Sequence, residues 1–503
     1  MKLGELLRGV PTLDSGASPT LEITSLAYDS RRAEWGTLFF AIQGEKADGH
    51  HFIGAALDRG AVAVVSERTA SPDLASRWIR VAKIRRALSD AGRTFLGHPD
   101  SRLRLVGITG TNGKTTTAFL MESVFRAAGI SAGLFGTIEH RWGGRALTAG
   151  NTTPESLDLL SYFAELVGSG GQAAVLEASS HALAQERLWG FPFQAAVFTN
   201  LTRDHLDYHH DFDTYFAAKR RLFEGLGTPP PGLAVINVSD PWGEKLLEVS
   251  TPRRITYGFN GNAQVKPAQF EQSPSGLRAT LATPEGKLEI ESPLIGRANL
   301  ANILAAVATS LGLGIAADQV RAGIAQLKAV PGRFERVEES QPFLVVVDYA
   351  HTDDALQNVL KTARELTHDR LIVLFGCGGD RDRTKRPLMG EAAGKLADFV
   401  VLTSDNPRSE EPVAIMNDAL VGLQRTARPY VVEVDREAAI RKALSEAREG
   451  DVVVLAGKGH ETYQILKDQT IPFDDREAAR KVLHELGYKT RRNGNLGRKP
   501  NGR

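Results

Sequence analysis

Two features that often reveal the class of a protein are almost missing from this chain of 503 residues. Its single cysteine, Cys377, excludes a disulfide framework and a thiolate zinc cluster and fits a reducing compartment. No run approaches the roughly 18 uninterrupted apolar residues of a membrane-spanning helix. Residues 1–5 reach an acid at once and contain no apolar segment, so no signal peptide is predicted. We therefore expect a soluble, cytoplasmic protein without membrane insertion.

An excess of charge of one sign is also lacking. The chain has 61 Lys+Arg and 60 Asp+Glu, a formal net charge of +1, which argues against nucleic acid or an anionic membrane as a partner. The balance is uneven, because residues 487–503 contain six basic residues, four glycines and no acid. We expect a disordered basic tail there. Without it the chain has 61 − 6 = 55 basic and 60 acidic residues, a net charge of −5.

Length and apolar patterning predict an α/β protein of about three domains. Continuous apolar runs separated by helical patterns indicate parallel sheets covered on both faces. The predicted strands lie at residues 37–42, 61–65, 103–108, 173–176, 195–198, 233–236, 343–347, 371–375, 399–402 and 452–456. The predicted helices include residues 52–57, 118–128 and 215–223. Polar alternation over residues 262–292 indicates an antiparallel hairpin, and Pro331-Gly332 indicates a domain boundary.

The most informative stretch, residues 107–116, reads Gly-Ile-Thr-Gly-Thr-Asn-Gly-Lys-Thr-Thr between a predicted strand and a predicted helix. Glycines there let backbone N–H groups approach phosphate oxygens, and the helix N-terminus adds partial positive charge. Lys114 would contact the β- and γ-phosphates, and the Thr115 hydroxyl would hold Mg²⁺. The strict phosphate-loop pattern needs glycine where Ile108 stands, so the first glycine is displaced to 107 or 110. An ordinary glycine-rich turn is the alternative, but the context favours nucleotide binding.

Metal-ligand types gather after the next strands. Glu177 ends a buried strand and would face the phosphate loop, where a carboxylate is a suitable Mg²⁺ ligand. Residues 203–209 contain five ligand-type side chains, although a single histidine such as His205 would more often be structural, and Mg²⁺ prefers oxygen. Lys219 lies on the helix predicted at residues 215–223, and the sequence alone favours a solvent-exposed lysine there.

The displaced glycine and the sequence Gly-Thr-Asn-Gly-Lys-Thr-Thr at residues 110–116 resemble the ATP loop of the Mur ligases, which build the peptide of bacterial cell-wall precursors. The resemblance extends to about residue 485. It is strongest to the members that add the third amino acid to UDP-MurNAc-L-Ala-D-Glu. It implies a uridine-nucleotide-binding α/β domain at 1–100, a central ATP-binding domain at 101–331 with the antiparallel appendage, and a Rossmann-like amino-acid-binding domain at 332–486.

The resemblance also assigns roles at the ATP and metal sites. Lys114, Glu177, His205 and Lys219 would be catalytic, with Lys219 carbamylated by CO₂, while Asp204 and Asp207 would be structural. An ammonium beside Mg²⁺ would be repelled, whereas a carbamate supplies two oxygen donors. The implied Mg²⁺ ligands are Thr115, Glu177, His205 and the carbamate on Lys219. The implied ATP-binding residues are Gly110, Thr111, Asn112, Gly113, Lys114, Thr115, Thr116, Asn299, Arg333 and Asp348.

The muramoyl dipeptide substrate is acidic and needs hydrogen-bond donors. The residues that the resemblance places against it are Tyr28, Ser30, Asn151, Thr152, Thr153, Ser179, Gln185 and Arg187. Of these, Tyr28 and Ser30, in residues 28–31, look like the family's contacts to the uridine diphosphate, as do residues 44–49, and both segments are weaker matches. Thr153 and Pro154 also form a pattern typical of a helix N-cap and first helical residue.

The third domain carries the implied amino-acid site. Its residues are Arg381, Asp405, Asn406, Pro407, Arg408, Gly457 and Glu461. Within the family, Asp-Asn-Pro-Arg marks ligases that take meso-diaminopimelate. The Arg408 guanidinium would clamp the distal carboxylate of diaminopimelate and repel the unpaired ammonium of lysine, and Glu461 would accept the distal ammonium. Cys377 is expected to be a small buried residue rather than a nucleophile.

The implied activity is amide formation driven by ATP through an acyl phosphate, with small-molecule substrates, a monomeric enzyme and closure of the third domain over the second. Three alternatives stay open. A lysine-adding Mur ligase differs only in the third substrate. A folylpolyglutamate synthetase lacks the domain before the phosphate loop. A phosphate-loop switch or nucleic-acid motor leaves Asp-Asn-Pro-Arg and the His205 cluster unexplained.

Overall fold

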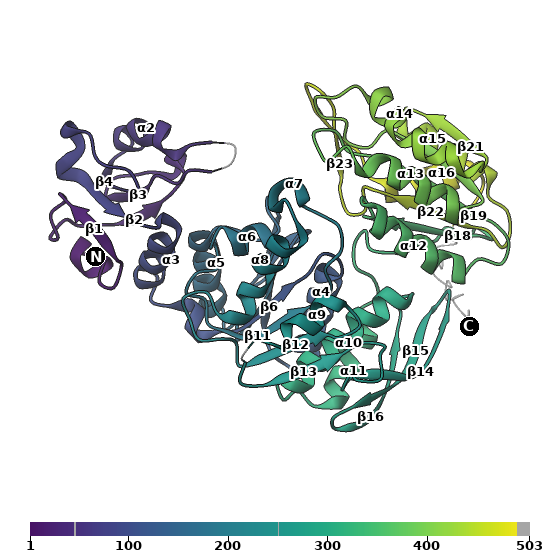
Figure 1. The fold of residues 1–503 in the computed structure, drawn as a ribbon, viewed down its shortest axis with the longest axis horizontal. Coiled ribbons are helices and arrows are strands. Elements are labelled where there is room, and N and C mark those ends of the chain that lie inside the picture. The colour runs from purple at the N-terminus through teal and green to yellow at the C-terminus, as the bar shows by residue number, and fades with distance from the viewer. Residues whose placement is uncertain (45–46, 250, 490–503) are drawn as a thin grey trace, which may run out of the picture.

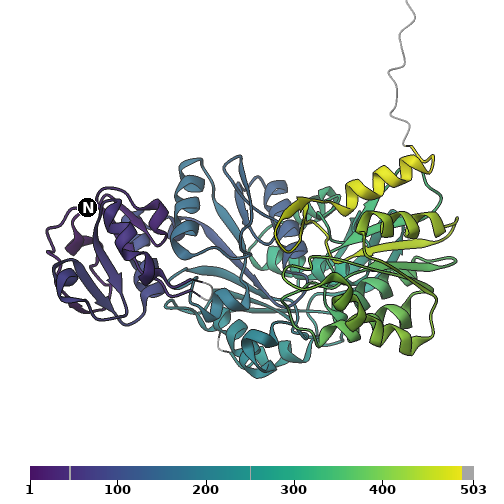
Figure 2. The same ribbon diagram turned by 90° about the horizontal axis from the view of Figure 1, so that it is seen from above.

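A computed structural model describes residues 1–44, 47–249 and 251–489. The chain forms three lobes that follow one another along its longest axis in sequence order (Figures 1 and 2). No helix of the described part is long and apolar enough to cross a membrane. Most of the predicted tail, residues 490–503, lies outside the described residues. Of its first residues, Tyr488 packs edge-to-face on Phe343 with ring centroids 5.7 Å apart.

The first lobe is built on a five-stranded sheet that is parallel except for its first strand. The strand order is β1 (Thr12–Ser15), β5 (Trp78–Val81), β4 (Ala61–Ser66), β3 (Thr37–Phe40) and β2 (Ser25–Ala27). The helices are α1 (Leu3–Leu6), α2 (Ile53–Asp58) and α3 (Ile84–Phe95), with 3₁₀ turns η1 (Ser30–Arg32), η2 (Gly49–Phe52), η3 (Pro72–Arg77) and η4 (Pro99–Arg102). The predicted strands at 37–42 and 61–65 are confirmed as β3 and β4, and nearly all residues of both strands are buried.

The central lobe contains an eight-stranded sheet, parallel from β13 to β7 and antiparallel from β7 to β9. The order is β13 (Arg254–Tyr257), β12 (Leu233–Asn237), β11 (Phe193–Phe198), β6 (Arg104–Thr109), β10 (Ala173–Glu177), β7 (Ala132–Phe135), β8 (Glu139–Trp142) and β9 (Arg145–Thr148). The helices are α4 (Lys114–Ala127), α5 (Ser156–Gly168), α6 (Ser180–Ala184), α7 (Leu206–His209), α8 (Phe212–Glu224), α9 (Pro241–Leu246), α10 (Arg297–Gly312) and α11 (Ala317–Gln326).

The two faces of this sheet belong to separate cores, since alternate residues of a strand point to opposite sides. In β6, Val106 and Ile108 join the core under α4 and α10, and Leu105 joins the other. The predicted antiparallel hairpin is confirmed and has one strand more, with β14 (Lys266–Ser273), β15 (Gly276–Thr283) and β16 (Gly286–Ser292) forming a small sheet. Its Leu281 and Ile290 pack into the core that contains Val106.

The third lobe has a six-stranded sheet, parallel except for β17. The order is β17 (Glu335–Val337), β18 (Leu344–Asp348), β22 (Val452–Ala456), β19 (Leu371–Phe375), β20 (Phe399–Thr403) and β21 (Tyr430–Glu433), and β23 (Tyr463–Ile465) pairs with β24 (Thr470–Pro472). One core holds α12 (Asp353–Glu365), α13 (Lys385–Leu396) and α14 (Pro412–Leu423), and the other holds α15 (Arg436–Glu446) and α16 (Asp475–Glu485); η5 is Gln424–Thr426.

The cores of this lobe contain a cysteine and an ion pair. Cys377 is 4% exposed inside the first core, with its Sγ 3.7 Å from the Met389 Sδ, and burial raises the pKa of its thiol to about 12. The expectation of a small buried residue is confirmed. Arg436 of α15 and Asp475 of α16 form a fully buried ion pair.

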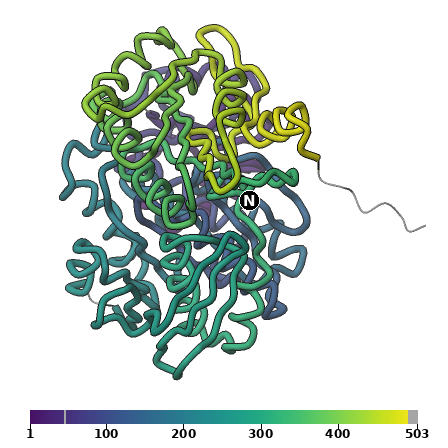
Figure 3. Tube along the Cα trace, turned by 90° about the vertical axis from the view of Figure 1, so that its right-hand side faces the viewer, coloured from purple at the N-terminus to yellow at the C-terminus, as the bar shows by residue number. Residues whose placement is uncertain are grey.

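The third lobe stacks on the central lobe when the molecule is seen along its long axis (Figure 3). The Asn112 Nδ2 of the phosphate loop donates to the Asp354 Oδ2 of α12 at 3.0 Å, and an Arg203 Nη donates to the Thr384 Oγ1 at 2.9 Å. The carboxyl ends of the central strands therefore face the third lobe. The boundaries at 100/101 and 331/332 remain predictions.

Candidate active site

The phosphate loop turns at two glycines whose conformations exclude other residues. Gly110 has φ +148°, and a Cβ there would lie 1.9 Å from the Thr199 Oγ1. Gly113 has φ +85°, and a Cβ there would lie 2.3 Å from the Asn302 Oδ1. Ile108 is a fully buried residue of β6, which explains why glycine is not needed at that position. The helix begins at Lys114, four residues before the predicted start, so this lysine lies in its first turn.

Two lysines converge on one carbonyl of this loop. The Lys114 Nζ donates to the Gly110 and Thr111 oxygens at 3.0 and 2.8 Å, and the Lys219 Nζ donates to the same Gly110 oxygen at 2.8 Å. Lys219 is 1% exposed, so the interpretation of a solvated helix lysine is wrong. Burial lowers the pKa of Lys219 well below its usual value, and the charge on Lys114 lowers it further. A neutral amine is the form that reacts with CO₂.

The buried carboxylate of Glu177 lies beside the start of α4. Its Oε2 accepts from the Thr115 Oγ1 at 2.9 Å and from the Thr137 Oγ1 at 3.0 Å, and its Oε1 accepts from the Thr137 N–H at 2.8 Å. The structure thus brings together Thr115 and Glu177, as the sequence predicts. Thr137 orients the carboxylate but has no motif that could have revealed it.

The histidine segment reaches the phosphate loop through an aromatic residue of α8. The His205 ring lies 4.7 Å from that of His181 and 6.2 Å from that of Tyr215, centroid to centroid. The Tyr215 hydroxyl is 3.1 Å from the Thr111 Oγ1, and the Lys219 Nζ lies 4.4 Å from the centre of the Tyr215 ring. Tyr215 therefore connects the His205 segment, Lys219 and the loop, which sequence reasoning did not foresee.

The side chains beside the phosphate loop supply only part of the donors that a magnesium ion needs. Across residues 1–44, 47–249 and 251–489, no three His, Cys, Asp or Glu side chains form a group that could hold a metal ion. Thr115 and Glu177 offer the oxygen donors that Mg²⁺ prefers. A carbamate on Lys219 would add two more oxygens, and phosphate oxygens of a bound nucleotide would complete the set. The residues therefore fit Mg²⁺ if Lys219 is modified.

The residues expected at the muramoyl dipeptide adjoin this carboxylate. The Thr153 Oγ1 donates to the Glu177 carbonyl at 2.6 Å and accepts from the Ser179 N–H at 3.0 Å. The predicted N-cap at Thr153, with Pro154 first in the helix, is wrong, because α5 begins at Ser156 with Glu155 as its N-cap. Hydrogen bonds to β10 and the following loop hold the Thr153 hydroxyl instead.

Arg187 is closely tied to this group. One Nη donates to the Thr153 carbonyl at 2.9 Å, and its Nε and other Nη donate to the Gln185 Oε1 at 3.1 and 2.7 Å. The Thr152 Oγ1 lies 3.2 Å from the Thr137 Oγ1, and Asn151 is exposed on the same loop. Hydrogen bonds therefore connect Thr153, Ser179, Gln185 and Arg187 in one group beside Glu177, and Thr152 reaches the same region through Thr137.

The two residues expected from the first lobe lie at its junction with the central lobe. The Tyr28 hydroxyl donates to the Asp158 carboxylate of α5, and Arg32 pairs with the same carboxylate at 2.8 Å. Burial and Asp158 raise the pKa of Tyr28. Ser30 is buried in η1. Tyr28 therefore joins two lobes, and its contact with a uridine nucleotide remains a prediction.

Residues of α10 and the third lobe approach the phosphate loop. An Arg333 Nη lies 3.4 Å from the Thr115 Oγ1, and its guanidinium lies 4.5 Å from the centre of the Tyr349 ring. The Asp348 Oδ2 accepts from the Phe334 N–H at 2.7 Å, so this carboxylate holds the segment after Arg333. The Asn299 Oδ1 accepts from Asn302 at 3.4 Å, the residue that lies against Gly113.

The predicted amino-acid residues surround a lysine that sequence reasoning did not assign. The Lys458 Nζ is fully buried and lies 3.4 Å from the Asp405 Oδ1, 3.2 Å from the Asn406 Oδ1 and 3.2 Å from the Glu461 Oε2. The Asn406 Nδ2 also donates to the Glu461 Oε2 at 2.8 Å. Burial and the Asp405 charge raise the pKa of Glu461. Gly457 lies at the same wall, where a Cβ would be 3.8 Å from the Asp405 Oδ2.

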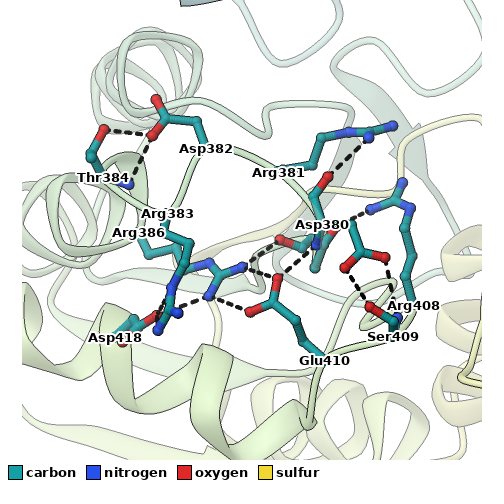
Figure 4. Close-up of polar contacts among 12 residues, drawn as sticks. Asp380, Arg381, Asp382, Arg383, Thr384, Arg386, Arg408, Ser409, Glu410 and Asp418 are labelled. Carbon is teal, nitrogen blue, oxygen red and sulfur yellow. Dashed lines mark hydrogen bonds and ion pairs between the residues drawn. The ribbon is translucent and has the colours of Figure 1, made fainter. Parts of the chain in front are cut away.

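Two arginines lie on neighbouring loops beside this cluster of Asp405, Asn406, Lys458 and Glu461, which we call the candidate amino-acid pocket (Figure 4). An Arg408 Nη donates to the Gly379 carbonyl at 2.7 Å, and an Arg381 Nη donates to the Asp380 carbonyl at 3.1 Å. Pro407, just before Arg408, is buried. The structure therefore groups the residues predicted for the amino acid around one part of the third lobe.

Three family descriptions match the chain in order: "Mur ligase family, catalytic domain" at residues 22–96, "Mur ligase middle domain" at 108–310 and "Mur ligase, glutamate ligase domain" at 332–459. The chain is 60% identical over 491 residues to a UDP-N-acetylmuramoyl-L-alanyl-D-glutamate–2,6-diaminopimelate ligase of Solibacter usitatus, covering 97% of this chain and 99% of that one. The chain belongs to the Mur ligase family. The α/β fold of three lobes predicted from the sequence is the architecture of this family.

Solved structures agree with this Mur ligase assignment. A structure of a ligase with the same name matches with a TM-score of 0.69 and 32% identity, over 97% of this chain and 100% of that one. A folylpolyglutamate synthase of Mycobacterium tuberculosis, complexed with ADP and AMPPCP, matches with a TM-score of 0.60 and 19% identity, over 80% of this chain and 96% of that one. The second likeness shows the fold alone.

Proposed function

We propose that this Mur ligase uses ATP to join meso-2,6-diaminopimelate to the D-glutamate side chain of UDP-MurNAc-L-Ala-D-Glu, a step in bacterial cell-wall precursor synthesis. The observation that carries the proposal is the 60% identity, over 97% of the chain, to a relative named for this reaction. The geometry is consistent with this, because Asp354 and Arg333 contact the phosphate-loop residues Asn112 and Thr115 at the junction of the second and third lobes.

The reaction has two steps. A D-glutamate carboxylate oxygen attacks the γ-phosphorus of ATP, and ADP leaves, giving an acyl phosphate. The diaminopimelate amine then attacks the acyl carbon, inorganic phosphate leaves and the nitrogen loses a proton. The first step brings two anions together, so it needs neutralisation of charge more than acid–base catalysis. Lys114 and Arg333 lie where they would supply it.

A bound Mg²⁺ would neutralise phosphate charge, and Thr115, Glu177, His205 and a carbamate on Lys219 would hold it. The Lys219 amine is buried against the loop carbonyl that Lys114 also contacts, so two ammonium groups there would repel each other. Carbamylation of the neutral amine would remove this repulsion, because Lys219 would then carry a negative charge. ATP would bind through residues 110–116 together with Asn299, Arg333 and Asp348.

The third-lobe pocket would select the amino acid by the charged groups at the distal end of its side chain. Diaminopimelate ends in a carboxylate and an ammonium, whereas lysine ends in an ammonium alone. The guanidinium of Arg408 matches the carboxylate, and Glu461 matches the ammonium. Arg381, on the loop beside Arg408, would add a second cation for carboxylates. The dipeptide substrate would lie against the surface formed by Thr152, Thr153, Ser179, Gln185 and Arg187, with Asn151 beside it.

The phosphate loop and the pocket come from the same chain, so we infer a monomeric, cytoplasmic enzyme whose partners are small molecules. Closure of the third lobe over the second would complete the site. Small-angle scattering with and without all substrates tests closure, and identical dimensions would contradict it.

The decisive test is ADP release by the purified full-length protein with ATP and the UDP-muramoyl dipeptide, with meso-diaminopimelate or L-lysine as the third substrate. We expect release with diaminopimelate and little with lysine. Arg408→Ala should lose most of this discrimination, and Arg441→Ala, on the exposed surface of α15, should keep it. Equal use of lysine by the wild type would contradict the proposed substrate.

A further inference from the structure

The loops that carry Arg381 and Arg408 are joined by a polar network outside the pocket itself (Figure 4). We call residues 376–384, after β19, and residues 404–411, after β20, the two pocket loops. Their strands are neighbours in the sheet and run parallel, so the loops emerge side by side. Side chains between them therefore decide how far apart the two arginines lie.

At the base of this network is Arg386, in the first turn of α13, whose side chain is 0% exposed. Its two Nη atoms donate to the two carboxylate oxygens of Glu410 at 2.7 and 3.0 Å, a two-pronged pair. They also donate to the Gly378 carbonyl at 3.3 Å and to the Asp418 Oδ2 at 2.8 Å. Arg386 thus contacts both pocket loops from beneath.

Glu410 also contacts Asp380, the residue before Arg381. Its Oε1 accepts from the Asp380 N–H at 2.6 Å. The Asp380 carboxylate in turn accepts from the Ser409 hydroxyl at 2.6 Å and from the Ser409 N–H at 3.2 Å. The residue next to each pocket arginine is therefore held by the opposite loop.

The backbone needs this support. Asp380 has φ +52° and Arg408 has φ +53°, and neither is glycine. The left-handed region is unfavourable for a residue with a Cβ unless its surroundings compensate. Glu410 and Ser409 hold Asp380, and Arg408 is held by the bond of its side chain to the Gly379 carbonyl and of its backbone N–H to the Ile465 carbonyl at 3.2 Å.

We propose that Arg386 and Glu410 are positioning residues that set the placement of Arg381 and Arg408 for the distal carboxylate of the amino acid. This inference rests on the proposed function, since it assumes a carboxylate-bearing third substrate. Arg386 is buried, so it acts through the pocket loops. Glu410 bonds to Arg386 and to the backbone N–H of Asp380 beside Arg381, whereas the bonds of the Asp418 carboxylate are to side chains, those of Arg386 and of Arg383.

Glu410 and Asp418 therefore form a matched pair for a test. Glu410→Gln and Asp418→Asn each remove one carboxylate partner of Arg386 with little change of shape, but only Glu410 also bonds to the backbone beside a pocket arginine, whereas Asp418 contacts the first pocket loop only through the Arg383 side chain. Steady-state kinetics on the full-length enzyme would give KM for diaminopimelate, for ATP and for the UDP-muramoyl dipeptide. For Glu410→Gln we expect KM for diaminopimelate to rise about 10- to 100-fold, as misplacement of binding groups predicts, with the other two constants nearly unchanged. Asp418→Asn should resemble the wild type.

A purely structural role would give a different pattern. If both variants raise KM for diaminopimelate equally, or if Glu410→Gln impairs ATP use as strongly, the inference is overturned. Ser409→Ala is the second variant, because Ser409 is exposed and its loss removes only one bond to Asp380. It should raise KM for diaminopimelate in the same direction, and wild-type values in both loop variants would refute the idea. If the wild type does not use diaminopimelate at all, the proposed function fails instead.

Discussion

Replacing Arg436 by methionine should destabilise the third lobe strongly and specifically. The side chains of Arg436 and Asp475 are both 0% exposed, and the Arg436 Nε and an Nη donate to the Asp475 oxygens at 2.8 and 2.7 Å. The other contacts of the guanidinium are the Ser404 carbonyl at 3.3 Å and the Ala456 carbonyl at 3.0 Å. The variant would leave an unpaired carboxylate in the core and two carbonyls without this donor.

The magnitude follows from this burial. Breaking a buried ion pair by removing one partner costs about 3–5 kcal/mol, since the remaining charge loses its compensation. In a unit of this size, 1 kcal/mol lowers the midpoint temperature by roughly 2–4 °C. The third lobe should therefore open roughly 6–20 °C earlier in Arg436→Met.

The single cysteine of the chain makes this opening measurable in the whole protein, where three lobes need not unfold together. Cys377 is buried in the third lobe and the pKa of its thiol is raised to about 12, so a thiol reagent should reach it only when this lobe opens. The rate of labelling as a function of temperature or urea thus reports the stability of the third lobe alone.

Two further variants decide whether the reasoning is right. Arg441→Met breaks the Arg441–Glu485 pair, which links the same two helices with both side chains 43% exposed, and should cost less than about 1 kcal/mol. The double variant Arg436→Met with Asp475→Leu removes both buried charges and should recover much of the loss. The argument is refuted if Arg436→Met labels no faster than Arg441→Met, or if the double variant is as unstable as the single one.

Three other predictions concern catalysis. Burial and then the charge of Asp405 raise the pKa of Glu461, so this carboxylate takes up a proton at a higher pH than an ordinary glutamate does. As the pH is lowered, KM for diaminopimelate should therefore begin to rise while the pH is still above about 4.3, the usual pKa of a glutamate. A Glu461→Gln variant should lack this rise. Labelled bicarbonate should give a carbamate carbon signal that disappears in Lys219→Met together with most activity; a signal that persists would place the modification elsewhere. Asp354→Ala removes the bond to Asn112 across the lobes, so KM for ATP should rise about threefold to tenfold, the loss of one ordinary hydrogen bond, and an unchanged value would show that this contact does not matter for nucleotide binding.

The strands that sequence predicted best are buried on both faces. β10 and β22 consist of continuously buried residues, and such runs are visible without any structure. β21 and the pair β23–β24 are short and partly exposed, so their sequences contain no comparable signal. The prediction of an N-cap at Thr153 was wrong for another reason, because the hydrogen bond of the Thr153 hydroxyl to β10 outweighed the local preference of threonine for a helix N-cap.

The residues of the candidate site also divide into those that the sequence reveals and those that it does not. The phosphate loop and Asp-Asn-Pro-Arg are recognisable because their residues are adjacent in sequence. Thr137, Lys458 and Arg386 act through partners far along the chain, such as Glu177 for Thr137 and Glu410 for Arg386. Spacing along one sequence does not reveal such pairs, so only the folded structure could.

The arrangement of the six-stranded sheet in the third lobe has a consequence for protein engineering. The loops that would choose the amino acid follow β19, β20 and β22, whose helices pack in cores of their own, apart from the core beneath the phosphate loop. A transplant of residues 376–386, 404–411 and 457–461 into a related ligase would carry the recognition surface with Arg386 and Glu410. The monomer inserted into the growing peptide could thus be exchanged, by design or during evolution, while the machinery that spends ATP stays as it is.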